Sequence, residues 1–139
     1  MFLVRLVYTS EVVRPIADSE IERILLAARA NNQNLGLTGM LCFHRKYFLQ
    51  CLEGSRTQVN KMYRTILKDE RHTNIVLLDY QEIVAREFDS WTMGYMPEST
   101  LTEAINMKFS GTKEFTPYEM LGESCHQMMI ELREKVPVV

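Results

Sequence analysis

Residues 38–54 read TGMLCFHRKYFLQCLEG, a stretch with two apolar runs. The runs, residues 38–44 and 47–53, flank the polar pair Arg45-Lys46, and this pattern predicts a β-hairpin. The pair lacks the Asn-Gly chemistry that two-residue hairpin loops favour. The two runs nevertheless predict neighbouring strands in one sheet.

Gln50 is a polar residue on an apolar strand face. Side chains alternate along a strand, so Gln50 points to the same side as Phe48 and Leu52. A buried amide without hydrogen-bond partners costs about 1–3 kcal/mol. Because an amide offers both donors and an acceptor, we expect Gln50 to meet two different polar partners in the interior.

The chain before this hairpin predicts a strand and then a helix. Residues 2–8 are apolar around one arginine, which predicts a strand. Ser19-x-x-Glu22 has the form of a capping box, so we expect the helix to begin just after Ser19. The apolar stripe of this helix comprises Ile21, Ile24, Leu25 and Ala28. Asn31 and Asn32 end the stripe.

The chain after the hairpin continues with a second helix and two strands. Ser55-x-x-Gln58 is another capping box, and the apolar stripe behind it predicts a helix. Residues 75–84 and 91–95 predict the strands. The order β-α-β-β-α-β-β predicts an α+β, ferredoxin-like fold with one sheet and both helices on one face.

The residues beyond Pro97 predict a C-terminal helical pair. Two segments have the sequence of a helix start: Thr100-x-x-Glu103 and Thr116-Pro117-x-Glu119. The second helix has an apolar stripe of Tyr118, Leu121, Cys125, Met128, Met129 and Leu132. So small a unit must pack on the free face of the sheet, on another subunit, or on both. We therefore divide the chain into residues 1–96 and a helical extension, residues 97–139.

Composition and charge exclude several classes of protein. The 139 residues fit one domain with an appended element, and a net charge of −2 does not suit a nucleic-acid-binding surface. No apolar run approaches the roughly 20 residues that span a membrane. Residues 1–8 lack the basic region of a signal peptide. Cys42, Cys51 and Cys125 are widely spaced in apolar contexts, which predicts reduced, buried thiols in a cytoplasmic protein.

Signatures of common enzyme families are absent from the sequence. It contains no P-loop, Cys-x-x-Cys pair, nucleophile elbow or HExxH motif. His44, His72 and His126 lie far apart, which predicts surface or structural histidines rather than a metal site. We therefore expect neither an enzyme nor a metalloprotein.

Five polar side chains lie where the pattern predicts a buried face: Tyr8, Asn31, Asn32, Gln50 and Asp69. Together they predict a polar cavity between the two helices and close to the sheet. A planar heterocycle with an imide edge fits such a cavity, because asparagine amides pair with N–H and C=O groups bidentately. Ile24 and Ile66, on the two facing stripes, would contact the two ring faces.

Six blocks of the sequence resemble the BLUF family of blue-light sensors, which use a flavin. The blocks cover about residues 1–95, and their spacing fits together: Leu6-Val7-Tyr8-Thr9-Ser10, Asn31-Asn32, Leu37-Thr38-Gly39-Met40-Leu41, Phe48-Leu49-Gln50-x-Leu52-Glu53-Gly54, Lys68-Asp69-x-Arg71-His72 and Trp91-x-Met93. The helical extension resembles, more loosely, that of short stand-alone members. Thr65 stands where the family often carries arginine, so one contact to the flavin tail is expected to differ.

The resemblance implies a flavin between the two helices. The implied cofactor is FAD, although the residues alone do not separate FAD from FMN. Asn31 and Asn32 would hydrogen-bond the dione edge, Gln50 would lie between the flavin and Tyr8, and two isoleucines would sandwich the ring. Three residues would lie toward the ribityl and phosphate side: Asp69, Arg71 and His72.

The resemblance also implies photochemistry rather than enzymatic turnover. Tyr8 would donate an electron and a proton, and the rearranged hydrogen bonds of Gln50 would shift absorption slightly to the red. The strand expected to carry Trp91 and Met93 would report the change to the C-terminal helices. We expect the signal to pass to a downstream partner protein. The apolar stripes beyond residue 100 also suggest a homo-oligomer.

Two other interpretations stay open. The same cavity can belong to a light-insensitive, ferredoxin-like module that binds another heterocycle. The βαββαβ order also occurs in small hydrolases of the acylphosphatase type, which would need an arginine-bearing phosphate loop after the first strand. Residues 9–17 contain Arg14 but no glycine, which disfavours that loop.

Overall fold

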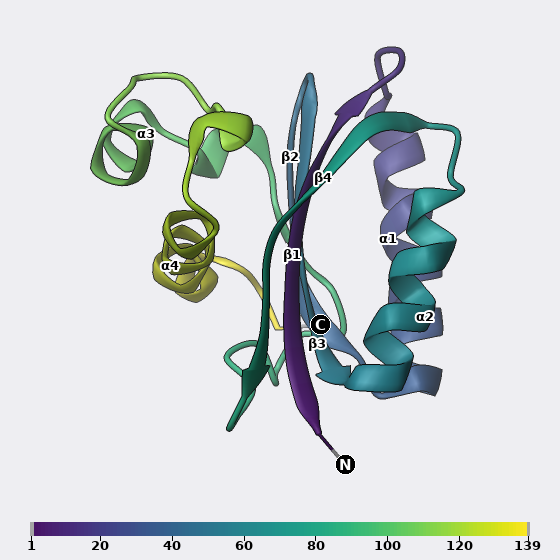
Figure 1. Cartoon of the computed structure of the whole chain (residues 1–139). Helices are drawn as coiled ribbons and strands as arrows, with labels where there is room; N and C mark the ends of the chain where they lie inside the picture. The colour runs from purple at the N-terminus through teal and green to yellow at the C-terminus, as the bar shows by residue number, and fades with distance from the viewer. Residues whose placement is uncertain (1, 139) are drawn as a thin grey trace.

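Five strands form one mixed sheet in the computed structural model, which describes residues 2–138 (Figure 1). In chain order they are β1 (Leu3–Val12), β2 (Thr38–His44), β3 (Tyr47–Ser55), β4 (His72–Ile83) and β5 (Gly94–Met96). The strands lie side by side in the order β4-β1-β3-β2-β5. All neighbours are antiparallel except β2 and β5, which are parallel.

Helices cover both faces of this sheet (Figure 1). On one face lie α1 (Asp18–Leu35) and α2 (Arg56–Leu67), and on the other lie α3 (Glu103–Ser110) and α4 (Gly122–Leu132). The α+β, ferredoxin-like arrangement expected from the order of elements is confirmed. Within the described residues, no helix combines the length and the apolarity needed to cross a membrane.

The hairpin of β2 and β3 and the start of α2 agree with the sequence. Arg45 has a φ of 23° in the hairpin turn, a conformation that side-chain-bearing residues rarely adopt. Ser55 is the N-cap of α2, and its Oγ accepts a hydrogen bond from the backbone N–H of Gln58 at 3.3 Å. The pairing places Tyr8 of β1 directly opposite Gln50 of β3.

The start of α1 differs from the expected capping box. The helix begins at Asp18, one residue before Ser19, and its N-cap is Ala17, which makes no side-chain cap hydrogen bond. The first turn instead carries Asp18 and Glu20, whose negative charges interact favourably with the positive end of the helix dipole. At the other end Gly36 adopts a φ of 68°, a left-handed conformation that suits glycine.

Three further element boundaries were wrong. The strand expected over residues 91–95 begins only at Gly94, so Trp91 and Met93 precede β5. The helix expected at Thr100 begins at Glu103, where Thr102 is the cap. The segment at Thr116 forms only a short 3-10 turn (Pro117–Glu119) before α4.

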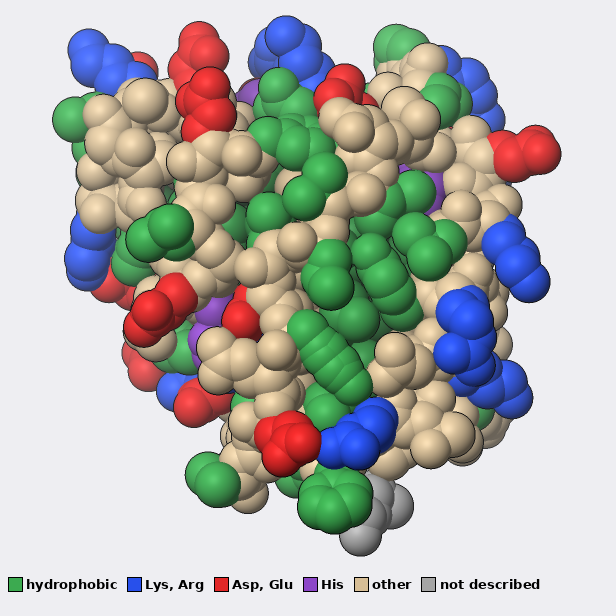
Figure 2. Space-filling model, viewed as in Figure 1, with side chains coloured by type: hydrophobic (Ala, Val, Ile, Leu, Met, Phe, Trp, Pro, Cys, Tyr) green, Lys and Arg blue, Asp and Glu red, His purple; other side chains and the backbone are tan. Residues whose placement is uncertain are grey.

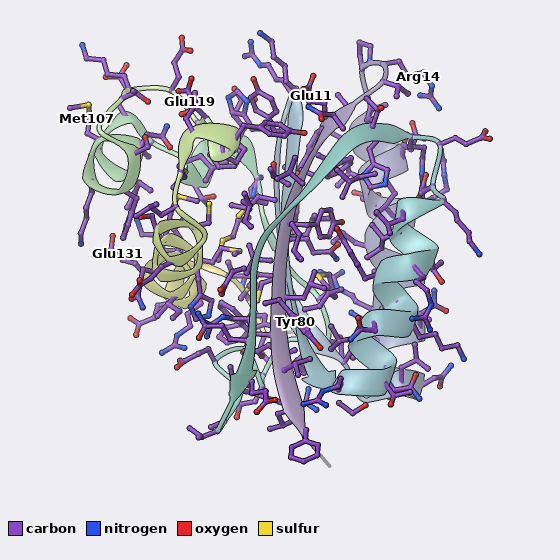
Figure 3. All side chains as sticks on the ribbon, in the orientation of Figure 1. Glu11, Arg14, Tyr80, Met107, Glu119 and Glu131 are labelled. Atoms are coloured by element: carbon purple, nitrogen blue, oxygen red, sulfur yellow. The ribbon has the colours of Figure 1, made fainter. Side chains whose placement is uncertain are left out.

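Two hydrophobic cores lie on the two sides of the sheet, and side chains fill both layers (Figure 3). The core beneath α1 and α2 contains Tyr8, Leu52 and Met93, among others. The far core joins the sheet to the C-terminal helices through buried residues of α4: Cys125, Met128, Met129 and Leu132. These four residues of the predicted stripe therefore pack on the free face of the sheet, whereas Leu121, which precedes α4, is exposed, and Met107 of α3 points outward (Figure 3).

Candidate functional site

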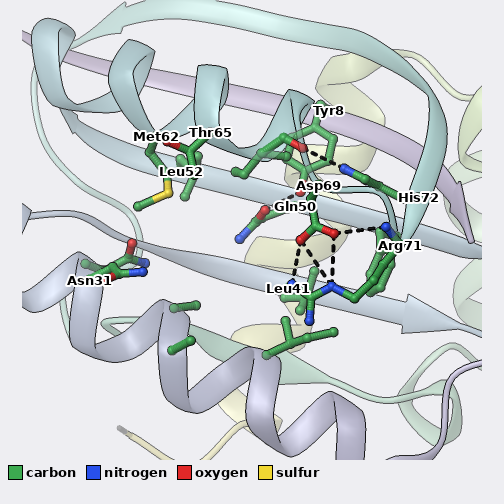
Figure 4. A pocket seen from close by; sticks show the side chains of 16 residues that line it. Tyr8, Asn31, Leu41, Gln50, Leu52, Met62, Thr65, Asp69, Arg71 and His72 are labelled. Carbon is green, nitrogen blue, oxygen red and sulfur yellow. Dashed lines mark hydrogen bonds and ion pairs between the residues drawn. The ribbon is translucent and has the colours of Figure 1, made fainter.

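A cavity of about 180 Å³ lies between α1 and α2, over the sheet (Figure 4). Its walls are mostly apolar, with side chains from both helices and from the central strands. All nine residues expected at a flavin line this cavity: Tyr8, Ile24, Asn31, Asn32, Gln50, Ile66, Asp69, Arg71 and His72. The strand and helix patterns, together with the family resemblance for Arg71 and His72, thus indicated residues that lie together in space.

Tyr8 and Gln50 form a buried hydrogen-bonded pair in the floor of the cavity. The phenol of Tyr8 donates to Gln50 Oε1, and the amide Nε2 of Gln50 lies 3.5 Å from Met93 Sδ. A thioether is a weak acceptor, so the amide N–H groups retain capacity for a stronger one. Gln50 thus has one strong polar partner within the protein, Tyr8, and a weak one, Met93.

Tyr8 is protonated across the ordinary pH range. Burial raises the pKa of its phenol well above the usual value, and Tyr63 and Asp69 raise it further. Only 4% of Tyr8 is exposed. A neutral phenol bonded to an amide oxygen can release its proton along that bond when its electron is removed.

The two neighbouring asparagines of α1 differ in their surroundings. Asn32 is buried, and its Nδ2 donates to the backbone carbonyl of Thr92 at 2.7 Å. Asn31 is exposed and points into one end of the cavity (Figure 4). Asn32 therefore links α1 to the segment before β5, while the amide of Asn31 is directed at the cavity.

Asp69 and Arg71 form an ion pair at the other end of the cavity (Figure 4). The guanidinium Nε of Arg71 donates to Asp69 Oδ1 at 3.0 Å, and the backbone N–H of Arg71 donates to the same oxygen at 2.9 Å. Hydrogen bonds from Arg71 hold the pKa of Asp69 below its usual value. Asp69 follows the end of α2 instead of lying on its apolar stripe.

His72 lines the cavity with its ring, while both ring nitrogens are bonded to the protein. Nε2 lies 2.7 Å from the carbonyl of Ile66, and Nδ1 lies 2.7 Å from Ser10 Oγ. A carbonyl only accepts, so Nε2 carries the proton and Nδ1 accepts from the Ser10 hydroxyl in the neutral ring. His72 therefore ties the end of α2 to β1 and packs edge-on against Tyr8.

Trp91 and Met93 lie on opposite sides of the sheet. Met93 is fully buried in the core beneath α1 and α2, next to Gln50. Trp91 belongs to the far core, and its indole Nε1 donates to the carbonyl of Pro137 at 3.1 Å. The short segment between them thus passes from one core to the other.

Sequence reasoning missed two residues that hold this segment. Glu53 is fully buried and bonds the backbone of Glu87 and Phe88, and Arg29 donates to the carbonyl of Met93 at 2.9 Å. The signal for Glu53 was present, because a carboxylate at a buried strand position needs partners as much as Gln50 does. Arg29 gave no comparable signal, because arginine is common on helix surfaces.

The cavity suits a planar ring with a polar edge. Ile24 of α1 and Ile66 of α2 supply apolar contacts from the two helices. Gln50 and Asn31 direct amide groups at it, and the ion pair of Asp69 and Arg71 lies at its other end. Among the described residues, no group of three or more His, Cys, Asp or Glu side chains is arranged to hold a metal ion.

Known proteins are similar to this chain in sequence and in structure. A family model described as BLUF, sensors of blue-light using FAD, matches residues 3–94. The blue light- and temperature-regulated antirepressor BluF of Escherichia coli (strain K12) is 37% identical over 86 residues, which cover 62% of this chain and 21% of that protein. The photoactivated adenylate cyclase subunit beta of Euglena longa is 31% identical over 100 residues, which cover 71% of this chain and 12% of that protein. The chain thus spans only a small part of the curated relatives it matches.

Solved structures that match nearly the whole chain include two different proteins. The photo-activated state of BlsA has a TM-score of 0.84 and 31% identity, and the match covers 94% of both chains. The dark state of BlrB, a BLUF protein, has a TM-score of 0.76 and 30% identity, and covers 94% of this chain and 96% of that one. Sequence and fold agree over the strands and helices that form the cavity, and the chain belongs to the BLUF family, the sensors of blue-light using FAD.

Proposed function

We propose that this protein is a blue-light photoreceptor that signals by protein–protein contact. The hydrogen bond from Tyr8 to Gln50 in the floor of the cavity between α1 and α2 carries the proposal. In a member of the BLUF family, this pair would couple a light-sensitive ring to the buried backbone of the sheet. The cofactor of the family is FAD, as its description states.

The residues around the cavity fit this cofactor. Ile24 and Ile66 would contact the two faces of the flavin ring, while the amides of Asn31 and Gln50 would pair with its carbonyl edge. The weak contact between Gln50 Nε2 and Met93 Sδ supports this assignment, because the amide gains a better acceptor in a flavin carbonyl. Asn32 would contribute its carbonyl oxygen and the second N–H of its amide, because the bond to Thr92 uses only one N–H of Nδ2.

The charged end of the cavity would meet the cofactor tail. Asp69 fixes the guanidinium of Arg71, which would favour the anionic side of FAD. His72 would supply a ring surface, because both of its nitrogens are bonded within the protein. Thr65, also in the lining, bonds its own helix at the carbonyl of Lys61 and offers no charge.

The proposed light response is a rearrangement at Gln50. When bound, FAD would supply blue-light absorption and accept an electron. Tyr8 would give up that electron and pass its proton from Oη to Gln50 Oε1, while Gln50 would release a proton from Nε2 toward the ring; the reverse transfers would restore Tyr8. Gln50 then presents its amide differently to Tyr8 and to Met93, so a side chain with two arrangements biases the backbone before β5.

We further propose that the C-terminal extension passes this change to a partner protein. Trp91 contacts the backbone at Pro137, so the segment beside Gln50 reaches the end of the chain. The structures of relatives include a bacterial light-regulated adenylyl cyclase, in which the match covers only 27% of that chain. In this chain we propose a sensor without catalytic activity of its own, with a partner of unknown identity.

The division at residue 96, the cytoplasmic location and the homo-oligomer also stay predictions. Three buried, unpaired cysteines fit a reducing compartment. The apolar stripe of α4 is used within the chain, so a homo-oligomer would need another surface. Figure 2 shows apolar side chains over the middle of the molecule, where the edge strand β4 exposes Val76, Leu77 and Tyr80. Native mass spectrometry of the purified protein checks the oligomer.

Absorption spectra before and after blue light test the proposal. We expect a flavin spectrum that shifts slightly to the red and recovers in the dark. Tyr8→Phe keeps the volume and removes the hydroxyl, so it should bind flavin and lose the shift; Gln50→Leu should do the same. Tyr63→Phe is a matched control, because Tyr63 packs against Tyr8 without donating to Gln50.

The same spectra decide between the proposal and its rivals. A purified protein that carries flavin but does not respond to light contradicts the photoreceptor. A different heterocycle released on denaturation, identified by mass spectrometry, favours the light-insensitive binding module. A normal photocycle in Tyr8→Phe rejects Tyr8 as the donor while leaving the family assignment intact.

A further inference from the structure

Glu53 is a carboxylate in the hydrophobic core on the far side of the sheet. Side chains alternate along β3, so Glu53 points to the same side as Leu49 and Cys51. All three are fully buried. Burying an ionisable group costs free energy unless the group is paired or well hydrogen-bonded. The hydrogen-bond partners of Glu53 therefore indicate its role.

Three donors converge on this carboxylate from outside β3. The backbone N–H of Glu87 donates to Oε2 at 2.7 Å, and that of Phe88 donates to Oε1 at 2.9 Å. The hydroxyl of Thr38 donates to Oε1 at 3.0 Å. Burial raises the pKa of Glu53 above its usual value, and these hydrogen bonds oppose part of the rise.

The backbone that Glu53 holds is the segment of residues 87–93, which we call the bridging segment. It lies between the end of β4 and the start of β5 and is not part of a sheet ladder. Arg86 reinforces its start, since its guanidinium donates to Thr38 Oγ1 at 2.9 Å and to the carbonyl of Gly36 at 2.8 Å. Side chains and single backbone contacts therefore fix this segment instead of regular pairing.

The bridging segment is bonded on its other flanks to the cavity and to the C-terminus. Toward the cavity, Asn32 donates to Thr92 and Arg29 donates to Met93. Toward the C-terminus, Arg133 donates to the carbonyl of Glu87 at 2.8 Å, and Trp91 donates to Pro137. A movement of this segment therefore changes contacts at both ends.

We propose that Glu53 is a positioning residue for the light response: its carboxylate anchors the bridging segment so that a change at Gln50 and Met93 reaches Trp91. Gln50 and Glu53 lie three residues apart on β3 and point to opposite faces of the sheet. The first contacts the side chain of Met93, and the second holds the backbone that leads to it. The inference rests on the proposed function, but the anchor itself is measurable in the dark.

Glu53→Gln is the most direct test, with Glu82→Gln as its matched control. Glutamine keeps the volume but replaces one acceptor oxygen with an N–H group, which then faces a backbone donor. Glu82 is another strand glutamate, but it is exposed and pairs only with Arg56 on the surface. Trp91 is the single tryptophan of the chain, so its fluorescence reports the bridging segment without a label.

We expect Glu53→Gln to keep flavin and the red shift, because Tyr8 and Gln50 are unchanged. Its Trp91 emission should move to longer wavelength, acrylamide quenching should increase, and the light-minus-dark change in emission should be at least halved. Glu82→Gln should match the unmodified protein in all three. A Glu53→Gln protein with unmodified Trp91 emission, quenching and light response overturns the inference.

Hydrogen exchange in the unmodified protein provides a second test that needs no variant. The amides of Glu87 and Phe88 donate to Glu53 and lie outside the ladders, so we expect slow exchange in the dark. If light moves the bridging segment, as we propose, losing one of these hydrogen bonds should speed their exchange about tenfold in the light. Rapid exchange in the dark, or equal rates in dark and light, contradicts the inference even if Glu53→Gln does not fold.

The two proposals fail in different ways. Unmodified protein without any red shift contradicts the photoreceptor, whatever the exchange rates are. The unmodified protein can instead show a normal red shift together with dark exchange at Glu87 and Phe88 as fast as in an unstructured loop. That result contradicts only the role of Glu53.

Discussion

Buried polar residues on β3 face both sides of the sheet, and each is satisfied by a group distant in sequence. Gln50 bonds Tyr8 and contacts Met93, while Glu53 bonds Thr38 and the backbone beyond β4. Hydrophobic burial alone would favour leucine at both positions. A buried polar network that is fully hydrogen-bonded holds the groups it joins in one specific arrangement, and the proposed light response depends on that precision.

His126 is a third buried polar residue, and its environment predicts a pH dependence of stability. It lies in α4 with 4% exposed, and its ring packs edge-on against Phe88. Burial is the main cause that lowers the pKa of His126 to about 4; Arg5 and Arg133 add to this, while Asp79 and Glu87 oppose it. The imidazole is therefore neutral in the folded protein at neutral pH.

The free energy of unfolding should fall as the pH drops from about 6.5 toward 4. The unfolded chain binds a proton at His126 near its ordinary pKa of 6.5, whereas the folded chain binds one only near 4. The contribution of neutral His126 to the free energy of unfolding is therefore fully present above pH 6.5. It decreases below that pH, by up to about 3 kcal/mol at the pKa that His126 has in the folded protein. Urea unfolding at pH 7.5, 6 and 5 measures this loss.

The variant His126→Gln separates this effect from other titrating groups. Glutamine does not titrate, so its unfolding free energy should change less between pH 7.5 and 5 than that of the unmodified protein. His44→Gln is the control, because His44 lies near the hairpin turn beside Glu98. Equal pH dependence in the unmodified protein and in His126→Gln would show that another group is responsible.

At the scale of elements, the docking of α4 depends on one glycine. A Cβ placed on Gly122 would lie 2.2 Å from the carbonyl oxygen of Leu78 in β4. Backbone atoms on a strand cannot give way as a side-chain end can. The close approach of α4 to the edge strand therefore requires the absence of a side chain at its first residue.

We expect Gly122→Ala to destabilise the protein although alanine favours helices. The gain in helix propensity is at most about 1 kcal/mol, while forcing an extra carbon into a packed contact costs about 1–3 kcal/mol. Thermal unfolding should show a lower midpoint for Gly122→Ala. The neighbouring exposed Glu123→Ala should change stability by less than about 0.5 kcal/mol. A higher midpoint in Gly122→Ala would mean that α4 shifts freely.

The elements that the sequence predicts well are those whose signals are local. The β2–β3 hairpin and the cap of α2 at Ser55 depend on neighbouring residues, and both agree with the structure. Arg71 and His72 were expected only from the family resemblance, whereas helical and strand periodicity indicated other cavity residues, among them Tyr8, Asn32 and Gln50, as polar groups on faces that are otherwise apolar. Such patterns require no knowledge of what packs against them.

The elements that were wrong depend on partners far along the chain. Residues 91–93 alternate like a strand, yet their carbonyls accept only one backbone bond from the sheet, from Gly39 of β2, and otherwise bond the side chains of Asn32 and Arg29. Ser19 does not cap α1, because the helix begins at Asp18 and Ser19 lies within its first turn. Glu53 could have been noticed as a charge in a buried strand, but its partners lie more than thirty residues later.

At the scale of the whole molecule, the two cores make the extension part of one folding unit. Residues of the sheet such as Val7, Cys42 and Leu49 share a core with Met128 and other residues of α4. The family match ends at residue 94, but the hydrophobic contacts do not end there. The same sheet therefore packs against α1 and α2 on the side of the cavity and against α4 on the other side, with a separate hydrophobic core on each side.

A chain shortened to residues 1–96 should lose solubility and stability while keeping the cavity. The cut would expose the far face of the sheet, where each fully buried aliphatic side chain contributes about 1.5–3 kcal/mol. Size-exclusion chromatography should show self-association, and thermal unfolding a lower midpoint than the full chain. If the shortened chain binds flavin again in detergent or under high pressure, α1 and α2 still form the cavity.

A matched chain that lacks only residues 137–139 should stay as soluble as the full protein, because it keeps α4. A stable, monomeric 1–96 fragment would mean that the extension is an independent output element instead of half of the core.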